Sequence, residues 1–371
     1  MTSNDENDES ELLEESTTGG NAEGEGRRYE IQPVDALQLV EGLNRVVIGQ
    51  SAAKEQLSHA VAMHIWRARS IALDRVPNVL IAGPSGCGKT LTASALADYC
   101  GVPFVDVEAT ALVPAGIVGF KVEHIAELLV EDATRILESY QGSVTDDEVL
   151  ALAERGIVFL DEFDKLASAS EADRKDSSLQ QRVQRRLLKF VEGDDVQIGE
   201  SQTFFARRAK NSLSTRRLLV IAAGAFSGID RLSHLRTNNE MYKRMFGRTD
   251  IVVAEDIINF GIMPELVGRL ELIVEFDALS VDELLRVLEN DQSSPLPSLL
   301  AYGRACSVDI SISSQALRII AERSRGLQTG ARGLQQLLFP LVTTRVSRAV
   351  SDGVDQVSID EKDFVVRSDL W

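Results

Sequence analysis

The chain has 371 residues, of which 44% are apolar and 26% charged, and its formal net charge at pH 7 is −18. This length is natural for two domains, and the excess of acidic residues disfavours binding to the phosphates of nucleic acids. No apolar run reaches the roughly 18–20 residues that are needed to cross a bilayer.

Residues 1–28 are rich in Asp, Glu, Ser, Thr and Gly, and Leu12 and Leu13 are almost their only large apolar residues. Such a composition buries too little apolar surface to offset the entropy of ordering, so a disordered acidic tail is predicted. The tail lacks the basic start and the apolar stretch of a secretory signal. The three cysteines form no CxxC pair, which predicts neither a disulfide framework nor a zinc site. These features favour a cytoplasmic protein without a membrane segment.

Apolar strands and amphipathic helices alternate from Tyr29 onward. Helical spacing of apolar residues predicts helices within residues 33–47, 50–72, 89–99, 121–139 and 179–192. Short apolar runs predict buried strands over residues 78–82, 104–107, 156–160, 217–223 and 272–276. Strands that alternate with helices form a parallel sheet with helices on both faces. The predicted fold class is therefore α/β, with one large domain over residues 29–276.

The pattern changes after residue 276, where helical spacing dominates. Helices are predicted over residues 280–290, 294–304, 314–324 and 330–350. A short pair of strands is predicted near residues 308–312 and 357–359. Residues 277–371 are therefore expected to form a small, mostly helical second domain.

A phosphate-binding motif, GPSGCGKT, follows the first predicted strand and opens the next predicted helix. It fits the pattern GxxxxGK[ST], in which glycines let backbone N–H groups curl around phosphate oxygens at a helix N-terminus. Lys89 is predicted to reach the β- and γ-phosphates of ATP, and the Thr90 hydroxyl to bind Mg²⁺. The predicted nucleotide-binding residues of this segment are Gly83, Pro84, Ser85, Gly86, Cys87, Gly88, Lys89, Thr90 and Leu91.

Two carboxylates, Asp161 and Glu162, follow the apolar run 157–160. Asp161 is predicted to hold Mg²⁺ at the strand end. Glu162 is predicted to orient the attacking water and to accept its proton as charge develops. An acidic pair after a strand is weak evidence alone, but the upstream phosphate motif makes it specific. Together the two motifs predict hydrolysis of MgATP.

The chain resembles AAA+ ATPases of the ClpX and HslU type, the Clp unfoldases, and is closer to ClpX. The resemblance covers about residues 29–350. It rests on eight segments in the same order: VVIGQ (46–50), GPSGCGKT (83–90), VGFKVE (118–123), RGIVFLDEFDKLA (155–167), LLKFVEG (187–193), AAGAFSG (222–228), GIMPELVGRL (261–270) and TGARGL (329–334).

The resemblance implies an ATP-driven ring, most often a hexamer, that unfolds or remodels a protein partner. It implies that Val47 and Ile48 pack on the adenine, with simple core packing as the alternative. Arg269 aligns with the arginine finger that reaches the nucleotide of the neighbouring subunit, with a surface ion pair as the alternative. Arg332 aligns with the sensor-2 arginine, which contacts the phosphates across the domain cleft.

The sequence also departs from the family. ClpX and HslU carry a GYVG loop whose aromatic residue grips substrate in the central pore, whereas this chain has Gly116, Ile117, Val118 and Gly119. Isoleucine keeps apolar bulk without the ring, which predicts weaker or more selective gripping, or a loop that does not translocate. The position of sensor 1, usually polar, falls near Ala223.

The cysteine count predicts that the zinc-binding domain of ClpX is missing, and no peptidase-docking loop is recognisable in residues 238–250. These departures favour a specialised remodeller of one partner. Two alternatives remain open: the ATPase subunit of a two-component protease that docks through an unrecognised loop, and a nucleotide-controlled binding switch without translocation. A DNA-acting ring is disfavoured by the acidic charge.

Overall fold

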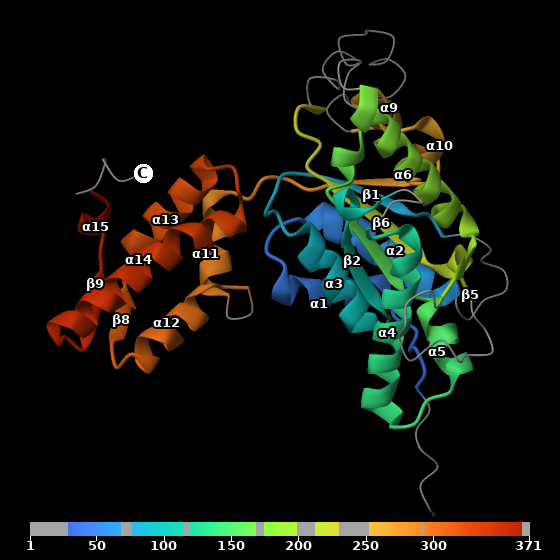
Figure 1. Cartoon of the computed structure of the whole chain (residues 1–371). Helices are drawn as coiled ribbons and strands as arrows, with labels where there is room; N and C mark the ends of the chain where they lie inside the picture. Colours follow the sequence, from blue (N-terminus) through green and yellow to red (C-terminus); the bar gives the residue numbers. More distant parts are fainter. Residues whose placement is uncertain are drawn as a thin grey trace, which may run out of the picture.

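The computed structural model describes residues 29–67, 76–113, 119–167, 174–198, 212–229, 252–290 and 293–365 (Figure 1). A five-stranded parallel sheet has the strand order β2-β3-β6-β1-β7. Its strands are β1 (Val79–Ala82), β2 (Phe104–Glu108), β3 (Ile157–Asp161), β6 (Leu219–Gly224) and β7 (Leu272–Glu275). The α/β fold class predicted from the sequence is confirmed.

The strands in the middle of the sheet are those with continuous apolar runs. Every residue of β1 and β6 is buried, as are the four apolar residues of β3. This pattern is required because helices cover both faces of a parallel sheet. The edge strand β2 instead alternates buried and exposed residues. Parallel pairing brings the carboxyl ends of the strands to one edge, where Glu108 lies opposite Asp161.

Five predicted helices surround the sheet: α1 (Ala36–Val46), α2 (Ser51–Arg67), α3 (Lys89–Cys100), α4 (Val122–Gln141) and α6 (Arg174–Gly193). The structure adds elements that were not predicted: α5 (Asp146–Ala153), α9 (Ala254–Phe260), α10 (Pro264–Val267) and the antiparallel strands β4 (Asp195–Gln197) and β5 (Ser212–Ser214). Among these, α5 carries a start signal, because Thr145 and Glu148 form a capping box.

A second group of helices follows the sheet: α11 (Val281–Glu289), α12 (Leu296–Ala305), α13 (Ser314–Gly326) and α14 (Ala331–Asp352). Strands β8 (Asp309–Ile312) and β9 (Gln356–Ile359) pair in parallel beside them, and α15 (Lys362–Val365) follows. The buried apolar residues form two clusters. We call them the first core (Ile31 to Phe276) and the second core (Leu279 to Ile359).

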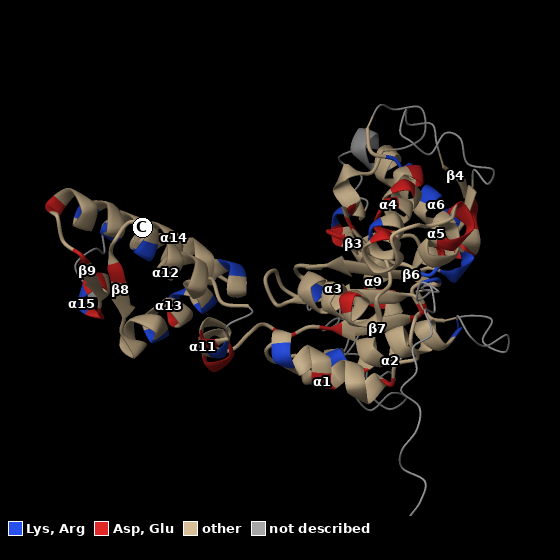
Figure 2. Cartoon of the chain, turned by 90° about the horizontal axis from the view of Figure 1, so that it is seen from below, with Lys and Arg blue, Asp and Glu red and all other residues tan. Residues whose placement is uncertain are grey.

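Residues 277 and 278 form the linker between the two cores, and Figure 1 shows α11 to α14 set apart from the sheet. Figure 2 shows basic and acidic residues interspersed along the outer helices of both groups. Within the described ranges, no helix combines the length and apolar character needed to cross a membrane.

One buried titratable group lies far from the carboxyl edge of the sheet. His64 on α2 is 2% exposed, and its Nε2 lies 2.8 Å from the carbonyl oxygen of Arg155. Its Nδ1 lies 3.3 Å from Nη2 of Arg67. Burial lowers the pKa of His64 to about 4, although the hydrogen bond to Arg155 opposes this effect. The neutral imidazole therefore belongs to the folded state.

We expect the free energy of unfolding to fall as the pH drops from about 6.5 to about 4, since only the unfolded chain takes up the His64 proton in that range. The contribution of neutral His64 to the free energy of unfolding is complete above pH 6.5, and at pH 4 at most about 3 kcal/mol of it is lost. Urea unfolding of the wild type and of His64→Gln over this range measures it. His59→Gln, at an exposed histidine, is the control. Equal pH slopes for wild type and His64→Gln would contradict the assignment.

Candidate nucleotide-binding site

The phosphate-binding segment lies between β1 and α3. Lys89 opens α3 with a buried side chain, and its Nζ donates to the carbonyl oxygens of Gly83 (2.7 Å) and Pro84 (2.8 Å). The ammonium group therefore lies inside the loop. It adds a full positive charge where the N-terminus of α3 already favours anions.

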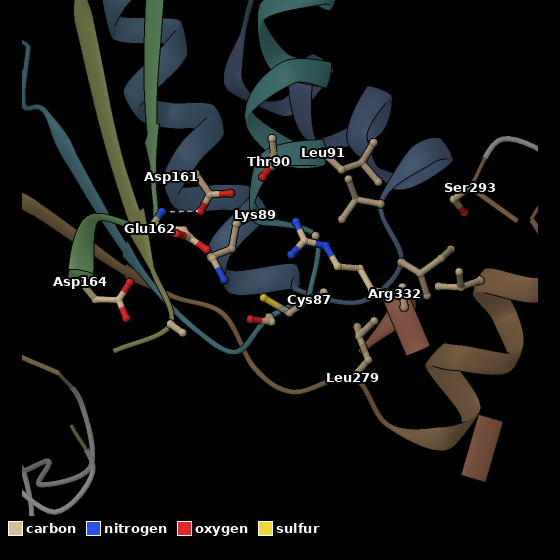
Figure 3. Close-up of a pocket in the computed structure, with 18 of the residues that line it drawn as sticks. Cys87, Lys89, Thr90, Leu91, Asp161, Glu162, Asp164, Leu279, Ser293 and Arg332 are labelled. Atoms are coloured by element: carbon tan, nitrogen blue, oxygen red, sulfur yellow. Dashed lines mark hydrogen bonds between the residues drawn. The ribbon is translucent and has the colours of Figure 1, made fainter. Parts of the chain in front are cut away.

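A cavity of about 670 Å³ opens over this segment (Figure 3). Volumes of this size are typical of sites for small ligands and cofactors. One wall consists of seven consecutive residues: Ser85, Gly86, Cys87, Gly88, Lys89, Thr90 and Leu91. Gly83 and Pro84, which were also predicted to bind nucleotide, line a neighbouring cavity, and their carbonyl oxygens contact Lys89 of this one.

The acidic edge of the sheet forms the opposite wall. Asp161 and Glu162 line the cavity at the end of β3, together with Glu108 from β2. Glu162 has a φ of 53°, a left-handed conformation in which non-glycine residues are strained, and its backbone N–H donates to Oδ1 of Asp161 (2.8 Å). Strained backbone of this kind clusters at functional sites because surrounding structure must hold it in place.

Arg332 reaches the cavity from the second core. It lies in the first turn of α14, and the N–H of Ala331 donates to the carbonyl oxygen of Gly86 (2.9 Å). This bond ties the start of α14 directly to the phosphate-binding loop. Figure 3 shows the Arg332 guanidinium directed toward the same volume as Lys89, Thr90 and Asp161.

The contact between the two backbones depends on glycine. Gly330 has a φ of 56°, and a Cβ there would lie 2.8 Å from the carbonyl oxygen of Ser85 and clash with that of Gly86. Neither obstacle is the end of a flexible side chain. The approach of α14 to the loop therefore requires the smallest residue at this position.

We expect Gly330→Ala to weaken ATP binding about tenfold or more, since a strained φ of roughly 1–3 kcal/mol adds to a backbone clash that pushes Arg332 away. Titration with a fluorescent ATP analogue measures the Kd. The matched control is Gly326→Ala, because Gly326 has open space around its Cβ direction. Wild-type affinity in Gly330→Ala would show that the contact with Gly86 does not place Arg332.

The far end of the cavity is apolar. Val47 is buried in the first core, whereas Ile48 packs against the second core. Both line the cavity with Leu279 and Val287. An apolar slot of this kind suits the flat face of a nucleobase. The predicted adenine contacts therefore share one cavity with the predicted phosphate contacts.

A buried lysine that the sequence did not point out fixes the backbone at this end. Nζ of Lys54 donates to the carbonyl oxygen of Val47 (3.1 Å) and to Oδ1 of Asn44 (2.6 Å). Burial lowers the pKa of Lys54, and Arg286 lowers it further, whereas Glu283 raises it. It is not among the residues that line the cavity, and its two hydrogen bonds support the cavity wall at Val47 from behind.

Arg269, the predicted arginine finger, follows α10 and lies outside the residues that line this cavity. Its Nη2 and Nε lie 2.7 Å and 3.1 Å from Oε1 of Glu192, and both side chains are more than a third exposed. The structure therefore does not bring Arg269 to the nucleotide site of its own chain.

Of the predicted pore loop, Gly116, Ile117 and Val118 lie outside the described residues, as does the segment 238–250 in which a docking loop was sought. Gly119 is described. Beside it, the N–H of Val113 donates to the carbonyl oxygen of Phe120 (2.8 Å), which closes the base of the segment.

Two carboxylates of the site were missed from the sequence. Glu108 ends a strand at the carboxyl edge of the sheet, so the rule that ligands bind at this edge could have identified it. Asp164 is buried and lines the cavity, and its Oδ2 accepts from the N–H of Phe226 (3.2 Å). That bond connects β3 to the segment that follows β6.

Near the predicted position of sensor 1, Ala223 is fully buried within β6. The residues of this segment that line the cavity are Ala225 and Ser227. Ser227 is thus the polar side chain that this segment contributes to the site. It was missed because it lies beyond the apolar run that defines the strand.

The chemistry of these residues fits MgATP. The Thr90 hydroxyl and the Asp161 carboxylate are hard oxygen ligands, as Mg²⁺ prefers. Among the described residues, no group of three or more His, Cys, Asp or Glu could form an all-protein metal site. Mg²⁺ held by one or two carboxylates together with substrate phosphates does not need such a group. Lys89 and Arg332 supply positive charge beside the same volume.

Comparisons with known proteins agree with this geometry. Residues 79–246 match the family described as "ATPase family associated with various cellular activities (AAA)". The matched range begins at β1, spans the phosphate-binding segment and continues past β3 and β6.

Three relatives are ATP-binding subunits of Clp protease. ClpX of Treponema denticola is 32% identical over 348 residues, 88% of this chain and 80% of the relative. ClpX of Azotobacter vinelandii is 34% identical over 322 residues, 80% of this chain and 70% of the relative. ClpX 2 of Wolinella succinogenes is 31% identical over 338 residues, 87% of this chain and 80% of the relative. The resemblance found in the sequence is thereby confirmed, and the chain belongs to the ClpX family of AAA ATPases, which hydrolyse ATP with Mg²⁺.

Proposed function

We propose that this chain unfolds or remodels a protein partner as one subunit of a hexameric ring, driven by ATP hydrolysis. The observation that best supports this is the convergence of phosphate-binding, magnesium-binding and water-activating side chains on one cavity that both cores line: Lys89, Thr90, Asp161, Glu162 and Arg332. Movement of the second core relative to the first during turnover would then do mechanical work on the partner.

In this proposal, each residue of the site has a defined task. Lys89 binds the β- and γ-phosphates, and Thr90 and Asp161 hold Mg²⁺, which neutralises charge as the phosphate bond breaks. Glu162 orients the attacking water and accepts its proton. Arg332 binds the phosphates from the second core and so makes its position depend on the nucleotide.

Arg269 acts on the nucleotide of a neighbouring subunit in this proposal. Its exclusion from the cavity of its own chain supports an action in trans. An arginine that acts in trans requires contact between subunits, and a closed ring satisfies this for every site. The ion pair with Glu192 holds the guanidinium until a neighbour approaches.

We further propose that residues 29–276 and 277–371 are two domains joined at the linker, which the separation of the two cores supports. We propose that the protein acts in the cytoplasm, because its sequence shows neither a secretory signal nor a long apolar run. The pore segment around Ile117 would contact the partner. Its apolar side chain favours a partner gripped through an apolar stretch of chain.

A second candidate function is supported by the names of the relatives, which are subunits of Clp protease. In that case, the ring would deliver unfolded protein to a peptidase. The absence of a recognisable docking segment in the sequence favours the dedicated remodeller.

One capture experiment tests the proposal. Tagged Glu162→Gln protein retains ATP but hydrolyses it slowly, so proteins bound by the ATP state accumulate on it. One dominant partner, released when ADP replaces ATP, is the expected result. A peptidase together with many unrelated proteins would establish the protease subunit instead. A variant that captures the same partner and fully supports function in cells would show a binding switch that needs no turnover.

A further inference from the structure

The two residues that follow Ile48 have an unusual backbone conformation. Gly49 and Gln50 have φ values of 72° and 58°, both in the left-handed region. Glycine adopts this conformation freely, but glutamine seldom does. A strained residue persists only where its surroundings hold it. We therefore expect the side chain of Gln50 to make contacts that stabilise this conformation.

The Gln50 carboxamide pairs with the backbone of the linker. Its Nε2 donates to the carbonyl oxygen of Asp277 (2.7 Å), and its Oε1 accepts from the N–H of Asp277 (3.0 Å). Both hydrogen-bonding groups of one linker residue are thus satisfied by one side chain. The same Nε2 lies 3.5 Å from the carbonyl oxygen of Cys87, inside the phosphate-binding segment.

The residues that follow the linker are also held in place. Gly49 lies against Glu283 at the start of α11, so closely that a Cβ on this glycine would clash with the carboxylate. From the second core, Nη1 of Arg325 donates to the carbonyl oxygen of Leu279 (2.6 Å). The two-bond contact of Gln50 connects the first-core side to Asp277 itself.

Gln50 is not among the residues that line the nucleotide cavity, although it directly follows Ile48 and Gly49. It therefore has no direct contact with ATP to lose. Any effect of its side chain on turnover must pass through the groups that it contacts, which are the backbone of Asp277 in the linker and the carbonyl oxygen of Cys87. This separates Gln50 from Lys89 and Arg332, whose replacement affects binding directly.

We propose that Gln50 is a positioning residue that couples the nucleotide cavity to the linker between the two cores. Its two bonds set the angle at which the second core presents Arg332 to the phosphates. A shift of the Cys87 segment on ATP binding or hydrolysis moves Asp277 through the same carboxamide. This inference rests on the proposed movement of the second core during turnover.

The test compares Gln50→Met, which keeps the length of the side chain and removes both polar groups, with Gln56→Met on the exposed face of α2. We expect Gln50→Met to lower kcat for ATP hydrolysis about tenfold, as for the loss of two neutral hydrogen bonds. The Kd for ATP should rise by less than in Gly330→Ala, because Gln50→Met leaves the bond from the Ala331 N–H to the Gly86 carbonyl oxygen in place. Gln56→Met should match the wild type in both measurements.

Spin labels attached to cysteines introduced at Glu138 on α4 and Ser351 on α14 report the distance between the two cores. Cys306 is replaced by serine, because the other two cysteines are buried and it alone is partly exposed. We expect MgATP to shift this distance in the wild type, and Gln50→Met to show a broadened distance that MgATP no longer shifts. A merely structural glutamine would lower thermal stability without changing the response to MgATP.

The outcomes separate the two proposals. A wild type that hydrolyses ATP without any change of distance would overturn the proposed movement, whatever Gln50 does. A normal shift and normal kcat in Gln50→Met would overturn the role of Gln50 and leave the proposed function standing. If Gln50→Met does not fold, Gln50→Glu replaces it in both measurements. Glutamate keeps the acceptor for the Asp277 N–H but places a second oxygen against the Asp277 carbonyl oxygen, which removes one bond and adds repulsion. Normal turnover in that variant would equally overturn the role of Gln50.

Discussion

Glu162→Gln is expected to lower kcat for ATP hydrolysis by about 10²–10⁴-fold, the range that removal of a general base produces. The amide keeps the size of the side chain and can still orient water, but it cannot accept a proton. The φ of 53° at this position is retained, because glutamine has the same backbone preferences as glutamate. The Kd for ATP should therefore stay within about twofold.

Single-turnover hydrolysis and equilibrium binding of ATP measure the two quantities separately. Glu131→Gln, which makes the same chemical change on the exposed side of α4, is the matched control and should behave as the wild type. If Glu162→Gln retained more than about a tenth of the wild-type rate, Glu108 or Asp164 would be the better candidate for the base, since both also line the cavity.

Arg269→Ala should lower kcat on the order of 10³-fold, as the loss of an arginine finger does in related phosphoryl-transfer reactions. Binding of ATP to the isolated chain should not change, because Arg269 does not line its own cavity. The control is Arg318→Ala, which removes another exposed arginine that is ion-paired, with Glu322 at 3.3 Å. That variant should retain wild-type turnover.

A mixing experiment decides whether Arg269 acts in trans. Arg269→Ala and Glu162→Gln proteins are each nearly inactive alone. In a mixed ring, a subunit with intact Glu162 can receive Arg269 from a neighbour that carries Glu162→Gln, so the mixture should recover part of the ATPase activity. A mixture as inactive as its components would show that Arg269 and Glu162 must belong to the same chain.

The sequence predicted best those features in which local pattern and tertiary environment agree. The strands β1, β3 and β6 are buried on both faces, so their continuous apolar runs were visible. The phosphate-binding segment was equally clear, because glycine, lysine and threonine have fixed positions in it. Its first two residues, Gly83 and Pro84, line a neighbouring cavity that shares Ser85 and Cys87 with the first, and their contact with nucleotide stays a prediction.

The features that could not be predicted from the sequence depend on contacts between residues far apart in the chain. The three-residue strands β4 and β5 are too short to show an alternating pattern. In the sequence, Lys54 is an ordinary helix lysine, because its hydrogen bonds to Asn44 and Val47 form only in the folded chain. The pairing of Gln50 with Asp277 joins residues 227 positions apart, which no local pattern records.

The bond between Ala331 and Gly86 also bears on how such a protein is divided for engineering. Ala331 and Arg332 line the cavity in which we propose that ATP binds, so the sheet-bearing part alone lacks part of the proposed site. Chimeras that exchange one part between relatives must therefore preserve the fit of Gly330 against the loop. In such designs the two sides of this contact must be taken from the same parent, and substitutions on either side must be chosen together.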